Sequence, residues 1–296
     1  MSISECTNTG GMRDPSDKKY PPFSVVISVY GKDKAEWFDT ALRSIISQTV
    51  KPDEIVLVID GPVPGSIRSV IHKTAGVCRR EGIRFQIIRF KTNQGLGMAM
   101  RAAVNAAEND IIAKMDSDDI SRADRFEKQL SLMAGRPSLA VAGGQIEEFI
   151  AVPENKVGKR VVPCMDREIK QYLKKRCPFN HVTVMFRRQS VQQAGGYRSW
   201  LWNEDYYLWI RMALRSQEFA NLPDTLVDVR VSRQMYERRG GIPYFRSEIG
   251  IQNLLLKKKL IGFPEYVMNS LGRLIVQVLL PGKIRGWVFR TAARQK

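Results

Sequence analysis

The sequence predicts an α/β protein in which a mostly parallel sheet is flanked by helices. Between Phe23 and Asp119, short apolar runs of strand length alternate with segments of helical periodicity, the pattern typical of a parallel sheet covered by helices. The length of 296 residues suits one large domain or two small ones, and 44% hydrophobic with 26% charged residues is ordinary globular composition. Disordered, collagenous and coiled-coil classes are therefore excluded.

Each element before Asp119 follows from its local pattern. The run Phe23–Tyr30 is apolar at nearly every position, which indicates a strand buried on both faces, and Glu54–Asp60 repeats this pattern before a Gly-Pro turn. The predicted strands are Phe23–Tyr30, Glu54–Asp60, Arg84–Phe90 and Asp110–Met115, and the predicted helices between them are Ala35–Ser47, Ile67–Glu81 and Leu96–Glu108.

The pattern after Asp119 is weaker and predicts fewer elements. Helices are expected near Ala123–Leu132 and Tyr206–Arg215, and strands near Ala140–Phe149 and Val182–Phe186. We divide the chain into a flexible leader at 1–20, the α/β domain at 21–230 and a basic helical C-terminal region at 231–296.

The charge of the chain is strongly positive and unevenly placed. The formal net charge is +17, and the segment from Val231 to Lys296 holds 13 Lys and Arg against 3 Asp and Glu. An evenly basic protein would indicate nucleic acid, whereas a basic end on an ordinary body favours an anionic surface met from one side.

The N-terminus and the cysteines predict a cytoplasmic protein. The segment Met1–Lys19 is polar and no apolar h-region follows, so no signal peptide is expected, and no window reaches the roughly 20 apolar residues of a spanning helix. The cysteines Cys6, Cys78, Cys164 and Cys177 form no CxxC pair, which favours reduced thiols over disulfides or a zinc site.

The strongest chemical signal is the acidic run Asp116-Ser-Asp-Asp119. Carboxylates this close repel one another unless a cation joins them, and ligands of parallel α/β sheets bind at the carboxyl ends of strands. Oxygen ligands suit Mg²⁺ or Mn²⁺, which commonly also hold substrate phosphates. The alternative is a solvated turn that caps the next helix, and the buried strand directly before the run favours the metal.

A second acidic pair, Glu204-Asp205, lies among Trp200, Trp202 and Trp209. Aromatic rings beside a carboxylate can stack on a sugar, and they remove water from the carboxylate, which raises its pKa toward that of a general base. The alternative is a tryptophan-rich core with acids that cap a helix.

Two further patterns, a Gly-rich segment and the two histidines, give weaker signals. The segment Asn93–Met100 is a partial GxGxxG that follows the third strand and lacks the last glycine, so it does not predict a dinucleotide site, although its Gly-rich turn can approach a phosphate. His72 is expected at the surface, and His181 is expected either as a structural residue or in the same cleft as Asp205.

Six segments of the chain follow one another in a specific order. They are Ser24–Tyr30, Ala41–Thr49, Pro52–Gly61, Asn93–Leu96, Met115–Ile120 and Asn203–Asp205. Together they resemble the family 2 glycosyltransferases of the GT-A fold, and within that family the bacterial enzymes of the amylovoran and colanic-acid type that build exopolysaccharide, capsule or O-antigen. Each motif alone is weak, whereas six in this order are specific.

The resemblance implies roles for residues at the donor site. Asp116 and Asp118 match the DxD acids that meet the ribose and hold Mg²⁺ or Mn²⁺ on the donor diphosphate. The other positions implied to bind the nucleotide-sugar donor are Ser28 and Tyr30 at the nucleotide base, Asp60 as the partner of uracil, and Asn93 and Gly95 in the Gly-rich turn.

The resemblance also implies the reaction. Asp205 matches the catalytic base, which would take the proton of an acceptor hydroxyl as that hydroxyl attacks C1 of the sugar and inverts it. The QxxRW signature of processive synthases is absent from Gln234–Arg238, so one sugar per encounter is expected. Ile59, Arg101 and Lys114 depart from common family residues, and the departures at Ile59 and Arg101 concern donor recognition.

The predicted function is a metal-dependent transfer from a UDP-sugar to a polyprenyl-diphosphate-linked glycan, with no nucleic-acid partner. Apolar residues at helical spacing in Phe263–Leu280, beside basic residues, predict peripheral contact with the inner face of the plasma membrane, although this helix could instead pack on the core. One alternative is a non-catalytic basic module that binds membrane or anionic polymer. The other is a sugar nucleotidylyltransferase, which would need a Gly-rich loop after the first strand, and the segment Tyr30–Lys34 is not such a loop.

Overall fold

The computed structural model describes residues 19–232 and 240–280 of the chain. Most of the predicted leader, the segment Gln234–Arg238 and the basic residues from Lys283 onward lie outside the described residues. The strands are β1 (Phe23–Tyr30), β2 (Glu54–Asp60), β3 (Arg84–Arg89), β4 (Ile111–Met115), β5 (Ile120–Ser121), β6 (Leu139–Phe149), β7 (Lys156–Arg160), β8 (Met185–Arg187) and β9 (Glu218–Arg230). The helices are α1 (Ala35–Ile46), α2 (Gly65–Glu81), α3 (Leu96–Ala106), α4 (Arg125–Ala134), α5 (Asp166–Leu173), α6 (Arg188–Gln193), α7 (Glu204–Ala213), α9 (Ile242–Lys257) and α10 (Phe263–Leu274).

The described strands form one mixed sheet in the order β3-β2-β1-β4-β8-β6-β9-β5, with β7 paired to β6. Strands β3, β2, β1 and β4 are parallel, whereas β8 runs antiparallel to both β4 and β6. Tyr30 of β1 lies opposite Asp60 of β2, and Ile27 lies opposite Met115 of β4. The loops after these three strands therefore leave the sheet at the same edge.

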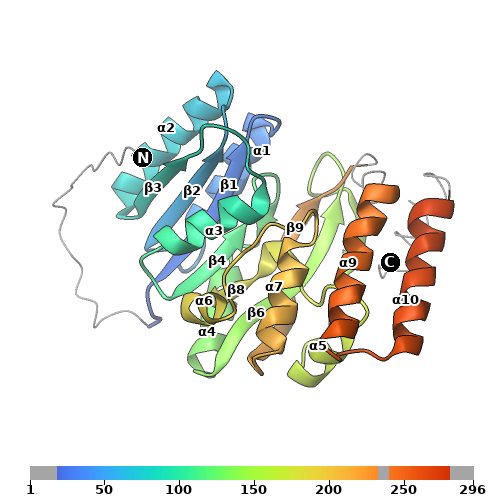
Figure 1. Cartoon of the computed structure of the whole chain (residues 1–296). Helices are drawn as coiled ribbons and strands as arrows, with labels where there is room; N and C mark the ends of the chain where they lie inside the picture. Colours follow the sequence, from blue (N-terminus) through green and yellow to red (C-terminus); the bar gives the residue numbers. More distant parts are fainter. Residues whose placement is uncertain (1–18, 233–239, 281–296) are drawn as a thin grey trace.

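Helices cover both faces of the sheet (Figure 1). One core lies between β1 and the helices α1, α2 and α4, and a second core joins the other face of β1 and β2 to α3, α6, α7 and α9. The helices take these places because each has an apolar face; in α1 that face is Phe38, Ala41, Leu42 and Ile45. The predicted α/β fold with a mostly parallel, helix-flanked sheet is confirmed.

The first half of the chain follows the sequence prediction more closely than the second. The strand expected at Val182–Phe186 is only partly right, because His181–Thr183 forms a 3₁₀ turn and β8 begins at Met185. The sequence did not predict β5, β7, β9, α5 or α6. Strand β7 has no buried residue and three basic ones, so it lacks the continuous apolar run that marks the central strands.

The described residues 240–280 of the C-terminal region are largely helical, as expected, and α9 and α10 lie side by side (Figure 1). Ile251 and Leu255 of α9 belong to the same core as α7. Arg273 of α10 donates to Glu248 of α9 at 2.8 Å, which joins the two helices. Within residues 19–232 and 240–280, no helix combines the length and apolarity needed to cross a bilayer. The domain boundary at 231 stays a prediction.

Candidate active site

The loops after β1 and β4 are joined by one carboxylate. Asp33, which follows β1, accepts the backbone N–H of Tyr30 at 3.1 Å and the hydroxyl of Ser117 at 2.8 Å through the same oxygen, Oδ2. Ser117 lies inside the acidic run, and Ser28 and Tyr30 lie at the end of β1. The predicted base-contacting strand end and the acidic run are therefore neighbours. The sequence analysis missed Asp33, whose position directly after a predicted strand is the signal that could have identified it.

Asp60, Asn93 and Gly95 come together at the end of β2. The carboxylate of Asp60 accepts the backbone N–H groups of Gln94 at 2.7 Å and Gly95 at 2.9 Å, and the Asn93 amide donates to the Asp60 carbonyl at 3.3 Å. Gly95 has φ +85°, a conformation that favours glycine, and it directly precedes α3. Because each carboxylate oxygen can accept more than one hydrogen bond, Asp60 holds this turn and still has acceptor capacity.

The acidic run after β4 is partly compensated by a buried cation. The ammonium of Lys114 pairs with Asp116. Burial, followed by the negative charges of Asp116 and Asp33, raises the pKa of Asp118 to about 6. Burial and the charge of Asp118 also raise the pKa of Asp119 well above its ordinary value, and Asp119 accepts the backbone N–H of Arg230 at 2.8 Å.

This donor set fits a divalent cation that also binds a phosphate. The repulsion that raises the pKa of Asp118 is the property that a cation would relieve. Within the part of the chain that the structure describes, no three His, Cys, Asp or Glu side chains form a ready cage. Asp116 and Asp118 would therefore supply part of an oxygen shell, and a diphosphate ligand would supply more, the usual arrangement for Mg²⁺.

Arg230, at the end of β9, lies against the acidic run. Its guanidinium is placed between the rings of Trp37, 4.7 Å from the ring centroid, and Phe149, 4.6 Å away. Its Nε donates to the carbonyl of Asp118 at 3.2 Å. The sequence analysis missed Arg230, and no local signal marks it, because 112 residues separate it from Asp118.

The second acidic pair lies in the first turn of α7. The carboxylates of Glu204 and Asp205 occupy the N-terminal end of this helix, where the helix dipole favours negative charge. Burial, with the charge of Asp205 second, raises the pKa of Glu204 to about 7. Burial also raises the pKa of Asp205. Hydrogen bonds from the backbone of Tyr206 and from the thiol of Cys177 lower this pKa, but by less than burial raises it.

One cation lies near both groups of acids. Lys114 is 1% exposed and is the penultimate residue of β4, directly before the acidic run. Burial raises the pKa values of Asp118, Glu204 and Asp205, and the positive charge of Lys114 opposes that rise in each of them. The fold thus brings the acidic run and the α7 acids into one electrostatic site. The sequence had marked Lys114 only as a departure from a common family residue.

The three tryptophans around the α7 acids have different environments. Trp209 is fully buried and packs edge-on against Phe179 at 5.1 Å, so it belongs to the core. Trp200 is partly buried against Tyr207 at 4.6 Å. Trp202 is 48% exposed, has φ +63° and packs on Tyr244 of α9 at 5.5 Å. The core interpretation is therefore right for Trp209, and Trp202 offers an aromatic face at the surface.

The two histidines are placed as the sequence expected. His72 is exposed on α2. His181 lies 3.0 Å from the hydroxyl of Tyr197, and burial followed by the charge of Lys114 lowers its pKa well below the ordinary value. His181 is therefore a neutral, hydrogen-bonded residue beside the site. The charge of Asp205 contributes to raising the Tyr197 pKa after burial, which places this pair near the α7 acids.

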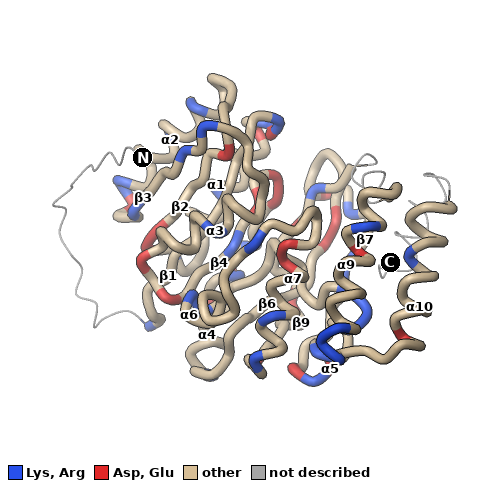
Figure 2. The backbone as a smooth tube through the Cα atoms, viewed as in Figure 1, with Lys and Arg blue, Asp and Glu red and all other residues tan. Residues whose placement is uncertain are grey.

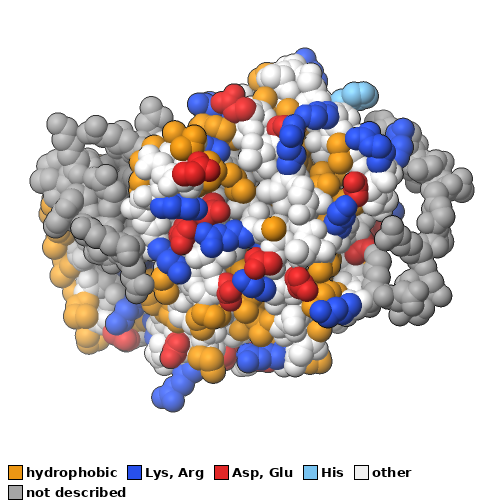
Figure 3. Space-filling view, turned by 180° about the vertical axis from the view of Figure 1, so that it is seen from behind, with side chains coloured by type: hydrophobic (Ala, Val, Ile, Leu, Met, Phe, Trp, Pro, Cys, Tyr) orange, Lys and Arg blue, Asp and Glu red, His pale blue; other side chains and the backbone are white. Residues whose placement is uncertain are grey.

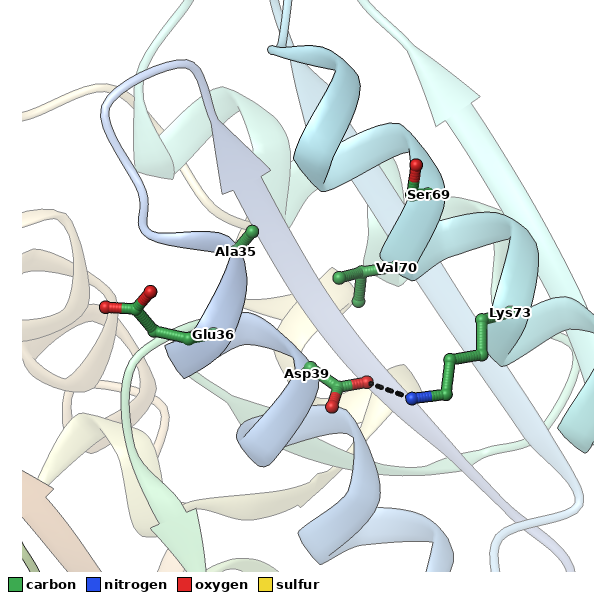
Figure 4. Close-up of a pocket in the computed structure, with 6 residues that line it drawn as sticks. All are labelled: Ala35, Glu36, Asp39, Ser69, Val70 and Lys73. Atoms are coloured by element: carbon green, nitrogen blue, oxygen red, sulfur yellow. Dashed lines mark hydrogen bonds and ion pairs between the residues drawn. The ribbon is translucent and has the colours of Figure 1, made fainter.

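A shallow pocket of about 280 Å³ lies between α1 and α2, apart from the predicted site (Figure 4). Asp39 and Lys73 point toward one another across it at 3.5 Å. The pocket is lined by Ala35, Glu36, Asp39, Ser69, Val70 and Lys73. None of these is a predicted site residue, so the pocket supplies a convenient place for control substitutions.

Comparison with known proteins gives consistent results. The family described as Glycosyl transferase family 2 matches residues 24–195. The chain is 36% identical to the amylovoran biosynthesis glycosyltransferase AmsE of Erwinia amylovora, over 90% of this chain and 97% of that protein. It is 34% identical to the UDP-Gal:alpha-D-GlcNAc-diphosphoundecaprenol beta-1,3-galactosyltransferase of Escherichia coli, over 93% of this chain and 98% of that protein.

Solved structures agree on the fold. S. aureus TarS 1-349 in complex with UDP-GlcNAc has a TM-score of 0.64 and 15% identity, over 91% of this chain and 79% of that one. The mannosyltransferase PcManGT of Pyrobaculum calidifontis, in complex with GDP-Man and Mn²⁺, has a TM-score of 0.60 and 14% identity, over 95% of this chain and 81% of that one. These likenesses show a GT-A fold. With this fold, and with close relatives matched over nearly their whole length, the chain belongs to glycosyltransferase family 2.

Proposed function

We propose that this protein is an inverting glycosyltransferase that moves one sugar from a UDP-sugar to a polyprenyl-diphosphate-linked acceptor in bacterial surface polysaccharide synthesis. The observation that carries the proposal is that the buried Lys114 pairs with Asp116 of the acidic run and that its charge also acts on Glu204 and Asp205 of α7. A single displacement needs the base and the leaving-group site within one cleft, because both act on the same anomeric carbon.

In this proposal Asp205 is the base. Its raised pKa makes it a better proton acceptor than an ordinary carboxylate, and it would take the acceptor hydroxyl's proton as the oxygen attacks C1. Asp116 and Asp118 would hold Mg²⁺ or Mn²⁺, which neutralises charge on the departing diphosphate. Attack from the α7 side and departure toward the acidic run give inversion at C1.

The names of relatives support the choice of substrates. The Escherichia coli relative is named for UDP-Gal as donor and for a GlcNAc-diphosphoundecaprenol acceptor, and TarS was solved with UDP-GlcNAc. In this proposal Asp60, whose carboxylate holds the Gly-rich turn, would accept from uracil of the donor. Because PcManGT was solved with GDP-Man, a guanine donor is the alternative that the assay must include.

The test is a donor screen with the full chain. UDP-Gal, UDP-Glc, UDP-GlcNAc and GDP-Man are each incubated with a GlcNAc-diphosphate-lipid, with Mn²⁺, with Mg²⁺ or with EDTA. We expect acceptor-dependent release of UDP from one UDP-sugar, loss of release in EDTA, and a product of inverted anomeric configuration. Liposome binding with no turnover of any donor would favour the non-catalytic module, and diphosphate release from UTP and a sugar 1-phosphate would favour a nucleotidylyltransferase.

We further propose that α10 holds the protein on an anionic membrane. One side of α10 contacts α9. Apolar side chains that are half exposed or more follow one another at spacings of three and four residues along α10 and the π-helical segment Ile275–Leu279 after it: Met268, Leu271, Ile275 and Leu279. Hydrophobic side chains gather at the edge of the molecule where α10 lies (Figure 3). Basic residues mark α5 and the C-terminal end of α9 nearby, including Lys257–Lys259 (Figure 2). An apolar stripe beside basic residues is the pattern of an interfacial helix.

Replacing Met268 and Leu271 together by Asp should release the protein from anionic liposomes. Both side chains are more than half exposed, so the change removes membrane contact and leaves the core intact. Each Lys or Arg near an anionic leaflet contributes roughly 1 kcal/mol, so 1 M salt should weaken wild-type binding without abolishing it. Co-sedimentation measures the effect, with Leu214→Asp, an exposed apolar residue at the C-terminal end of α7, as the control.

The membrane contact could also be tested by truncating the chain after Gly262, but point substitution disturbs the fold less. Removing α10 would leave the buried Glu248 without Arg273 and Gln252 without the Asn269 amide. If the Met268→Asp/Leu271→Asp variant is folded and co-sediments as well as wild type, the proposed contact surface is wrong.

A further inference from the structure

The candidate base makes a hydrogen bond that the proposed reaction does not explain. The thiol of Cys177 donates to Oδ2 of Asp205 over 3.4 Å. Cys177 lies in the loop between α5 and the 3₁₀ turn His181–Thr183, 28 residues before Asp205 in the chain. A thiol is a weak donor, so this contact is informative only if the fold holds it in place.

The fold does hold this loop in place from two sides. Arg160, at the end of β7, donates through Nη2 to the carbonyl of Cys177 at 3.0 Å. The amide of Asn221 in β9 donates to the carbonyls of Pro163 at 2.6 Å and Pro178 at 3.3 Å. The backbone around the thiol is therefore anchored independently of Asp205, and the thiol meets the carboxylate at a defined position.

The thiol has one proton and two acceptors. Besides Asp205 Oδ2, the carbonyl of Phe179 lies 3.6 Å from Cys177 Sγ. An ionised carboxylate is the stronger acceptor, whereas a protonated carboxyl no longer competes in this way. Burial, with the charge of Asp205 second, raises the pKa of Cys177 well above its ordinary value, so the thiol keeps its proton.

We propose that Cys177 is a positioning residue for the base, and this rests on the proposed role of Asp205. Before transfer, the S–H group orients the ionised Asp205 carboxylate and stabilises its charge. During transfer the acceptor's proton moves to Asp205, and the thiol turns its own proton to the carbonyl of Phe179. The thiol neither gains nor loses a proton, so it assists the base without entering the chemistry.

Other charged and titratable groups also face Asp205, and the test must separate the thiol from them. Lys114 and Arg160 lower the pKa of Asp205 through their positive charges, after the larger effect of burial. Glu204 and Tyr197 interact electrostatically with Asp205 as well. The groups to be left unchanged in the test are Glu204 on α7, Lys114 on β4, Arg160 on β7 and Tyr197 in the loop before α7.

The experiment is the pH dependence of kcat for wild type, Cys177→Ala and Cys177→Ser, with both substrates saturating. Because the thiol stabilises the ionised form of Asp205, removing the thiol should raise the pKa of the base. The fall of kcat on the acid side of the profile, its acid limb, should then occur at higher pH. We expect a shift of about half a pH unit in Cys177→Ala, in keeping with a weak donor. In Cys177→Ser a hydroxyl replaces the thiol as donor, so the limb should return to the wild-type position or below it.

Controls separate this proposal from the assignment of the base. Cys164→Ala removes a partly buried thiol that contacts Gln145 and should leave the profile unchanged. UDP affinity measured at each pH removes any contribution from titration at the donor site. If Asp205→Asn is inactive but the Cys177→Ala limb coincides with wild type, the positioning role is wrong and the base stands. If Asp205→Asn keeps wild-type activity, the base assignment itself fails.

Discussion

Asp205→Asn should lower kcat by about 10²–10⁴-fold, the usual effect of removing a general base. Asn has nearly the same size and cannot accept the acceptor's proton. Donor affinity should barely change, because Asp205 is proposed to meet the acceptor and not the nucleotide. Steady-state transfer to the lipid-linked acceptor measures the rate, and calorimetric titration with UDP measures donor affinity.

Glu204→Gln is the matched comparison for this result. The two acids are consecutive in the first turn of α7, and burial raises the pKa of both, that of Glu204 to about 7. Since a base acts in its ionised form, wild-type kcat should fall as the pH falls through the pKa of the base, which lies above the ordinary aspartate value of 3.8. If Glu204→Gln is inactive while Asp205→Asn is fully active, the base is Glu204 and not Asp205.

Asp118→Asn should lower transfer by about 10²–10³-fold, because charge stabilisation by a cation is worth several kcal/mol. The substitution also removes a carboxylate whose pKa burial and the neighbouring acids raise to about 6. UDP binding should lose its dependence on Mn²⁺, and a weaker binding that EDTA does not affect should remain. Titration with UDP in Mn²⁺ and in EDTA measures this change apart from turnover.

The control for Asp118→Asn is Asp39→Asn in the pocket between α1 and α2. Asp39 pairs with Arg43 and Lys73 at the surface, so the same chemical change is made outside the site. Normal transfer by Asp118→Asn, with either Mg²⁺ or Mn²⁺, would remove this residue from the metal site. Loss of activity in Asp39→Asn would instead mean that the α1–α2 pocket belongs to the working surface.

Local patterns predicted the central sheet and its acidic edge. The buried strands β1, β2 and β4 are apolar at nearly every position, and a few consecutive residues of the sequence are enough to recognise this pattern. The rule that ligands of parallel sheets bind at the carboxyl ends of strands then marked the acidic run after β4 as a candidate site. The order of six motifs indicated the family, which the comparisons confirmed.

Long-range contacts around the site were not predictable in this way. Arg230 contacts Asp118 across 112 residues, and Cys177 contacts Asp205 across 28. Neither residue carries a local signal, because β9 and the loop after α5 reach the site only through the pairing of β9 with β6 and the packing of α7. The interaction partners of such residues are a property of the packed chain.

The sequence by itself determined the fold class, the glycosyltransferase family and the two acidic motifs, since periodicity, strand ends and motif order are properties of neighbouring residues. Only the tertiary structure decided which side chains surround those motifs. It paired the buried Lys114 with Asp116 within electrostatic reach of the α7 acids, buried Trp209 while leaving Trp202 exposed, and brought the Cys177 thiol onto Asp205. These features depend on burial and on distances between segments far apart in the chain, and burial is what changes the pKa of a carboxylate.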